Sequence, residues 1–150
     1  MALKISTGLR NKLLDTGSFA TVMAGGLVKI YSGTAPLTAD DAIGSAGTNV
    51  LLCTISIDGL GTGINMEAAA VGGTIEKKTT EAWKGTNAAS GVATFYRHVA
   101  VGDNGSLSTT QARLQGAIGT AGAEMNFTST SLTAGADQNV DYYRVTLPTA

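Results

Sequence analysis

The sequence places its most reactive side chains next to one another in the run Phe95-Tyr96-Arg97-His98, and His98 is the only histidine. A histidine can act as a general base or a metal ligand when a nucleophile or further ligands lie beside it. The sequence contains no Gly-x-Ser-x-Gly nucleophile motif. Successive side chains of a strand point to opposite faces, so the four side chains would be divided between two faces of the sheet. We therefore predict that His98 is a half-exposed strand residue with a structural role, and that the chain is not an enzyme.

Metal ligands are too few for a zinc site, which needs four nitrogen or sulfur ligands, because the chain has one His and one Cys. Cys53 has no partner for an internal disulfide, and the apolar run around it predicts a buried side chain. Oxygen ligands for calcium are available from the loop carboxylates Asp40, Asp41, Asp58, Glu67 and Asp103. Their spacing does not match an EF-hand, and aspartates commonly cap turns, so we expect no metal and no cofactor.

Two further patterns resemble binding motifs but fit a structural role better. The glycines of residues 59–63 and the pair Gly72-Gly73 are not followed by the helix that a dinucleotide-binding loop needs, so we expect turns there. Glu81 and Trp83 are the only local hint of a sugar-cleaving site, which would need a pair of acids beside an aromatic-lined cleft. We predict instead that Trp83 anchors the core from a short strand.

The composition points to a protein that works in an assembly. Charged residues make up 14% of the 150 residues, against roughly 25% in typical soluble domains. The net charge is −1, which offers no basic excess for direct nucleic-acid binding, and no apolar run approaches the roughly 20 residues of a membrane span. Because the first residues do not resemble a signal peptide, we expect the protein to be made in a cytoplasm.

Residues 1–26 have a helical pattern that the rest of the chain lacks. A Ser-Thr pair can cap a first helix in which Leu9 and Leu13 share one face. Ser18 can cap a second short helix that contains Phe19. Helices this short are marginal alone, so they must dock on their own sheet or on a neighbouring subunit. We predict an N-terminal helical segment over 1–26 that contributes Leu9, Leu13 and Phe19 to a contact with a neighbouring subunit.

Residues 27–150 contain many short strand-like runs with frequent turn signals and no intervening helix. The principal runs are 27–31, 49–57, 64–69, 74–79, 82–84, 92–101, 112–118, 124–128 and 139–147. Clusters of Gly, Asn, Asp and Ser separate them. This pattern predicts a mainly β domain, an antiparallel β-sandwich of jelly-roll or Ig-like type.

The segment that follows the run 92–101 is rich in Gly, Ser and Thr and begins with the turn signal Asp103-Asn104-Gly105. Surface loops of this composition tolerate several conformations and often carry binding residues. We predict that Asp103 and Asn104 lie in a contact with a neighbouring molecule.

Four segments resemble small structural proteins of tailed bacteriophage virions. They are 7–19 (TGLRNKLLDTGSF), 29–33 (KIYSG), 91–97 (GVATFYR) and 141–148 (DYYRVTLP). In such proteins a small β-domain commonly decorates the capsid and holds neighbouring capsid subunits together against the pressure of the packaged DNA. The resemblance implies a capsid decoration or cement protein on the virion surface, with the major capsid protein and copies of itself as partners.

Two other functions stay open on the sequence alone. A minor tail or baseplate component would belong to the same class of virion proteins. A carbohydrate-binding or receptor-binding β-sandwich module would use the segment 102–123 as its recognition surface. The number of copies in a particle separates head from tail, and glycan binding would favour the recognition module.

Overall fold

The computed structural model describes residues 3–149 and is mainly β, with 37% strand and 12% helix. Its helices are α1 (Thr7–Asp15) and α2 (Phe19–Val22), and η1 (Ile43–Ala46) is a 3₁₀ turn. Its strands are β1 (Lys4–Ile5), β2 (Leu27–Ser32), β3 (Val50–Ile57), β4 (Thr74–Glu76), β5 (Trp83–Thr86), β6 (Gly91–Val92), β7 (Phe95–Val99), β8 (Arg113–Gly119), β9 (Met125–Asn126), β10 (Ser131–Leu132), β11 (Asp137–Val140) and β12 (Arg144–Thr146). The predicted mainly β class with a short N-terminal helical segment is confirmed, and the arrangement is consistent with a β-sandwich.

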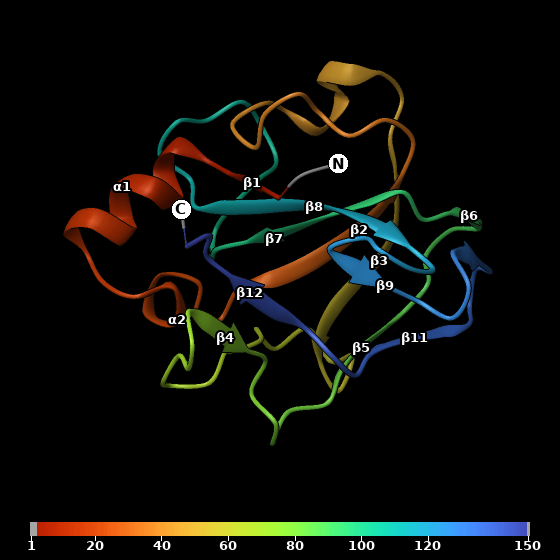
Figure 1. Ribbon diagram of the computed structural model, residues 1–150. Helices are drawn as coiled ribbons and strands as arrows, with labels where there is room; N and C mark the ends of the chain where they lie inside the picture. Colours follow the sequence, from red (N-terminus) through yellow and green to blue (C-terminus); the bar gives the residue numbers. More distant parts are fainter. Residues whose placement is uncertain (1–2, 150) are drawn as a thin grey trace.

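An eight-stranded sheet forms the centre of the fold (Figure 1). Its strands follow the order β1-β8-β7-β2-β3-β5-β11, in which every neighbouring pair is antiparallel. Strand β9 is the eighth strand of this sheet and pairs in parallel with the end of β8. Two small antiparallel ribbons, β4 with β12 and β6 with β10, complete the architecture, and β12 crosses in front of the central strands in Figure 1.

The two helices begin where their capping residues predict. The Ser6 side-chain oxygen accepts a hydrogen bond from the Leu9 N–H at 3.0 Å, which caps α1. The Ser18 oxygen accepts from the Thr21 N–H at 3.2 Å, which caps α2. A serine in this position satisfies one of the N–H groups that the first turn of a helix leaves without a partner.

The N-terminal segment shares the core of the sheet. Its strand β1, which the sequence pattern did not indicate, pairs Ile5 with Leu114 along the edge of β8. Leu9 is fully buried in the central hydrophobic cluster. A Cβ atom on Gly8 would collide with the backbone of residues 110–111, so α1 lies directly against that loop.

Both faces of β7 are covered, because all of its residues are buried. Tyr96 and His98 pack on one face against Tyr143, the residue just before β12. Arg97 points to the other face, where it binds the loop around Asp41. The predicted alternation of this strand is therefore confirmed. The prediction of a half-exposed His98 is wrong, since 1% of the residue is exposed.

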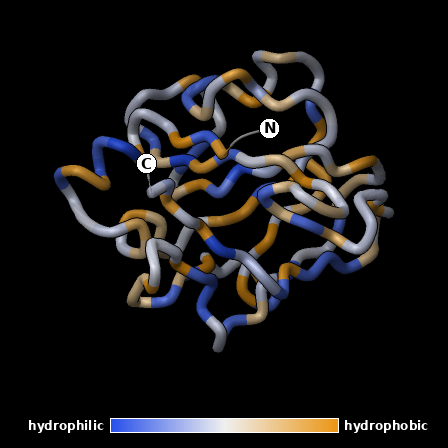
Figure 2. The backbone as a smooth tube through the Cα atoms, in the orientation of Figure 1, coloured by the Kyte–Doolittle hydropathy of each residue, from blue (hydrophilic) through white to orange (hydrophobic). Residues whose placement is uncertain are grey.

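Apolar residues of the strands supply most of the core. Figure 2 shows hydrophobic stretches along the strands that cross the middle of the molecule and paler or hydrophilic stretches over much of the loops. Cys53 and Trp83 are buried, as predicted. Neither helix within residues 3–149 has the length and apolar character needed to cross a bilayer.

The structure differs from the predicted strands in several places. The run 92–101 is divided into β6, which pairs with β10, and β7, which pairs with β2 and β8, and β10 lies outside the predicted runs. Residues 64–69 form only isolated bridges, of Ile64 with Gly26 and of Met66 with Lys77. The run 139–147 is divided into β11 and β12, because the chain leaves β5 and then pairs with β4. The jelly-roll or Ig-like type stays a prediction.

Candidate functional site

His98 is part of the aromatic core. Its Nδ1 lies 3.0 Å from the Tyr143 hydroxyl, and the rings of Phe19 and Trp83 make edge contacts with it at 5.8 and 6.4 Å between ring centroids. Its Nε2 is buried with no hydrogen-bond partner among residues 3–149. Burial lowers the pKa of His98 to about 3, so the imidazole is neutral near pH 7. These contacts give the histidine a packing role.

Two arginines hold loops onto the other face of the sheet. Arg113 forms a bidentate pair with Asp103, in which its Nη2 lies 2.8 Å from Asp103 Oδ1, and it also donates to the carbonyls of Asp40 and Ser106. Arg97 donates to the Asp41 carbonyl at 2.9 Å. A buried guanidinium needs such partners, because removal from water is costly for a charge.

The same network determines the role of Asp103. Burial alone would raise the pKa of this carboxyl, but hydrogen bonds from Arg113 and from the Gly105 N–H outweigh burial and lower it. The Asp103 side chain has no exposed surface, so its contact with Arg113 is internal; the residue as a whole is half-buried, and its predicted contact with a neighbouring molecule stays a prediction. Asn104 is exposed and accepts a hydrogen bond from the Ser106 N–H, and its predicted contact stays a prediction.

Glu81 and Trp83 also form a structural pair. The Trp83 indole donates to Glu81 Oε2 at 2.9 Å, and Glu81 accepts two further hydrogen bonds from the backbone and side chain of Asn65.

Burial raises the pKa of Cys53 to about 11, so its thiol is protonated near pH 7. Among the residues that the structure describes, no group of three or more His, Cys, Asp or Glu side chains is placed to hold a metal ion.

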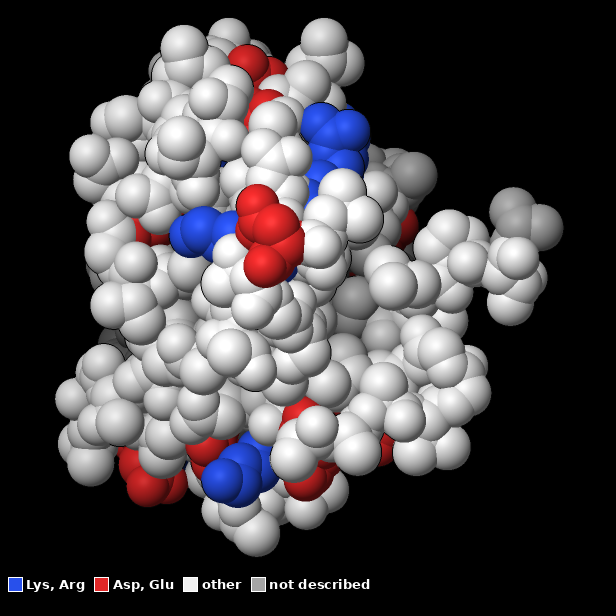
Figure 3. Space-filling view, turned by 90° about the vertical axis from the view of Figure 1, so that its left-hand side faces the viewer, with Lys and Arg blue, Asp and Glu red and all other residues white. Residues whose placement is uncertain are grey.

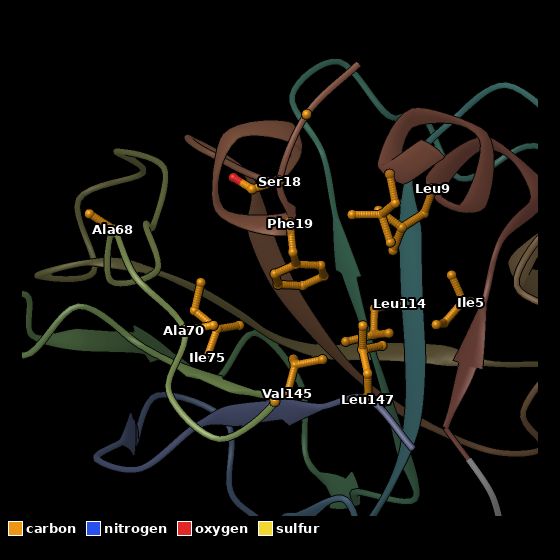
Figure 4. Close-up of a pocket in the computed structure, with 13 residues that line it drawn as sticks. Ile5, Leu9, Ser18, Phe19, Ala68, Ala70, Ile75, Leu114, Val145 and Leu147 are labelled. Carbon is orange, nitrogen blue, oxygen red and sulfur yellow. The ribbon is translucent and has the colours of Figure 1, made fainter. Parts of the chain in front are cut away.

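An apolar groove lies where the N-terminal helices meet the C-terminal strand. Its cavity volume is about 330 Å³, and Figure 4 shows the Phe19 ring projecting into it between two groups of aliphatic side chains. The groove is lined by Ile5, Leu9, Leu13, Gly17, Ser18, Phe19, Ala68, Ala70, Gly73, Ile75, Leu114, Val145 and Leu147. Among residues 3–149 no charged residue lines the groove, and the Ser18 hydroxyl already caps α2. The groove can therefore accept apolar groups.

The structure brings three of the predicted contact residues together in this groove. Leu13 and Phe19 are half-buried there, whereas Leu9 is fully buried in the core and offers no surface of its own. Asp103 and Asn104 do not line the groove. The sequence did not predict the opposite wall of the groove. This wall is formed by residues 68–75, by β12 and by Leu147, which follows β12 and is 51% exposed.

The face that carries the helices has few charges. Figure 3 shows this side of the molecule as a largely uncharged surface with small, separate groups of acidic and basic side chains. A partner that covers this face would therefore bury few charged side chains. No family model, curated protein or solved structure matches the chain.

Proposed function

We propose that this chain is a non-enzymatic structural protein of a phage virion, a decoration or cement protein that binds the outer surface of the capsid. The observation that carries the proposal is the apolar groove between α1, α2 and β12. It combines side chains from both ends of the chain in an open cavity of about 330 Å³. The resemblance to small virion proteins in 7–19 and 141–148 involves segments that contribute side chains to both walls of this groove, together with residues 68–75.

The groove is suited to an apolar anchor of the partner. Because its lining is uncharged, it favours aliphatic or aromatic side chains from a loop or arm of the major capsid protein. Each such contact can be weak. A decoration protein that also contacts copies of itself gains affinity from many simultaneous contacts on the lattice. The residues that could do chemistry, His98 and Cys53, are buried; near pH 7 the imidazole is neutral and the thiol is protonated.

The groove is tested by placing a charge in it. The variant Leu147→Asp is expected to attach at least about tenfold more weakly to capsids, because a carboxylate in the groove loses water without gaining a partner. Leu147 is 51% exposed, so the fold tolerates the change. The measurement is co-sedimentation of purified protein with capsids from a phage that lacks the gene.

Leu107→Asp is the matched control, because Leu107 is 70% exposed and lies outside the groove. It is expected to attach like the unaltered protein, and circular dichroism checks that both variants are folded. Equal attachment of the Leu147→Asp and Leu107→Asp variants would show that the groove is not the contact. Point variants are preferred to deletion of residues 1–16, which would remove β1 and the buried Leu9 from the core.

A further inference from the structure

A second cavity, on a different part of the molecule, is polar. It has a volume of about 360 Å³, within the range of roughly 300–1,000 Å³ that small-molecule sites occupy. Its walls are residues 126–128, at and after β9, and residues 137–142, which comprise β11 and the connection toward β12. It shares no lining residue with the apolar groove, so an inference about it is independent of the proposed capsid contact.

The polar side chains of this cleft retain hydrogen-bonding capacity. Asp137 and Asp141 are exposed carboxylates, and Asp137 uses one oxygen to accept from the Thr86 hydroxyl at 3.2 Å. The Gln138 amide donates to the Asn139 carbonyl at 3.1 Å, which leaves its oxygen as an acceptor. Carboxylates and amides side by side can accept from and donate to the same hydroxylated ligand.

Tyr142 adds an exposed aromatic ring to the cleft. The residue is 62% exposed, and the Arg144 guanidinium lies over its ring, 5.3 Å from the centroid. Arg144 lies outside the lining of the cleft, so this contact restricts the ring without filling the cleft. The flanking residues Val140 and Tyr143 are buried, so the backbone that carries the ring is anchored on both sides.

We propose that this cleft binds a neutral saccharide. A sugar ring has an apolar C–H face, which matches the Tyr142 ring, and hydroxyl groups at its edge, which match the carboxylates and amides of 137–141. The charges of Asp137 and Asp141 disfavour anionic sugars and phosphate-bearing ligands. A site whose backbone is already held in place loses little conformational freedom on binding.

The test is a nuclear magnetic resonance titration of ¹⁵N-labelled protein with maltotriose, cellotriose and N-acetylchitotriose, beside sialyllactose and trilysine. At least one neutral trisaccharide is expected to shift the amide signals of residues 126–128 and 137–142, with weak, millimolar affinity. The variant Tyr142→Ala is expected to weaken this binding at least tenfold. Tyr142→Phe, which keeps the ring, and Leu107→Ala, which lies outside the cleft, are expected to retain it.

Three results would overturn the saccharide site. One is that none of the neutral trisaccharides shifts the cleft residues at millimolar concentration. Another is that the shifts persist unchanged in Tyr142→Ala. The third is that only trilysine or sialyllactose binds there, which would assign the cleft to a cationic peptide or an anionic sugar. The spectrum of each variant reports directly whether it is folded.

Discussion

Replacing Asp103 with alanine is expected to lower the free energy of unfolding by about 3–5 kcal/mol, because it leaves a buried guanidinium without its opposite charge. The side chains of Arg113 and Asp103 are both fully buried, and the carboxylate also accepts from the Gly105 N–H at 2.7 Å. The change therefore removes the pair and frees the start of the loop. The expected loss is large for a domain whose total stability is about 5–15 kcal/mol.

Urea unfolding followed by circular dichroism measures this effect. The exposed Thr109, in the same loop, supplies the control, and Thr109→Ala is expected to change the unfolding free energy by no more than about 0.5 kcal/mol. Asp103→Asn keeps the shape of the side chain and loses its charge, so its loss of unfolding free energy is expected to lie between those of Thr109→Ala and Asp103→Ala. A loss below about 1 kcal/mol in Asp103→Ala, the value of a surface ion pair, would contradict the internal role of Asp103.

The second large effect is loss of stability in mild acid through His98. Its pKa is about 3 in the folded protein, and the pKa of an unfolded histidine is about 6.5. Below the unfolded value the unfolded chain binds a proton that the folded chain does not, so stability falls as the pH falls from about 6.5 toward about 3. The expected loss is about 2 kcal/mol between about pH 7.5 and pH 5.

This window isolates the histidine. It is the only one in the chain, and Asp41, Glu67, Glu81 and Asp103, whose pKa values are lowered by their hydrogen bonds against the effect of burial, add to the loss only at lower pH. Unfolding free energies are measured in urea across this range for the unaltered protein and for His98→Gln. The variant is expected to be less stable but nearly independent of pH there, and a variant with the original slope would refute the assignment.

Local signals in the sequence predicted the helices and most of the sheet. Ser6 and Ser18 stand directly before the turns that they cap, and the predicted run 49–57 forms the single strand β3 (Val50–Ile57). The two-residue strand β1 is too short to have a period, so only its pairing with β8 reveals it. The division of 139–147 depends on a change of partner strand, from β5 to β4, which is not a local property.

Only the wall of the apolar groove that the N-terminal helices form could be predicted from the sequence. Leu13 and Phe19 belong to a helical pattern that the sequence displays, whereas Ile75 and Leu147 lie far along the chain and reach the groove only through the pairing of β4 with β12. Asp103 was expected at a contact because its turn composition is that of a surface loop. Its internal role depends on Arg113, which is ten residues away and whose position is set by the register of β8.

We propose that the chain coats a capsid, and the number of copies in a particle tests this proposal most directly. Quantitative mass spectrometry of purified virions from a phage that carries the gene gives this number relative to the major capsid protein. For a protein that decorates the capsid we expect hundreds of copies, comparable to the number of capsid subunits. Absence from purified virions, or a handful of copies as for a minor tail or baseplate component, would contradict it.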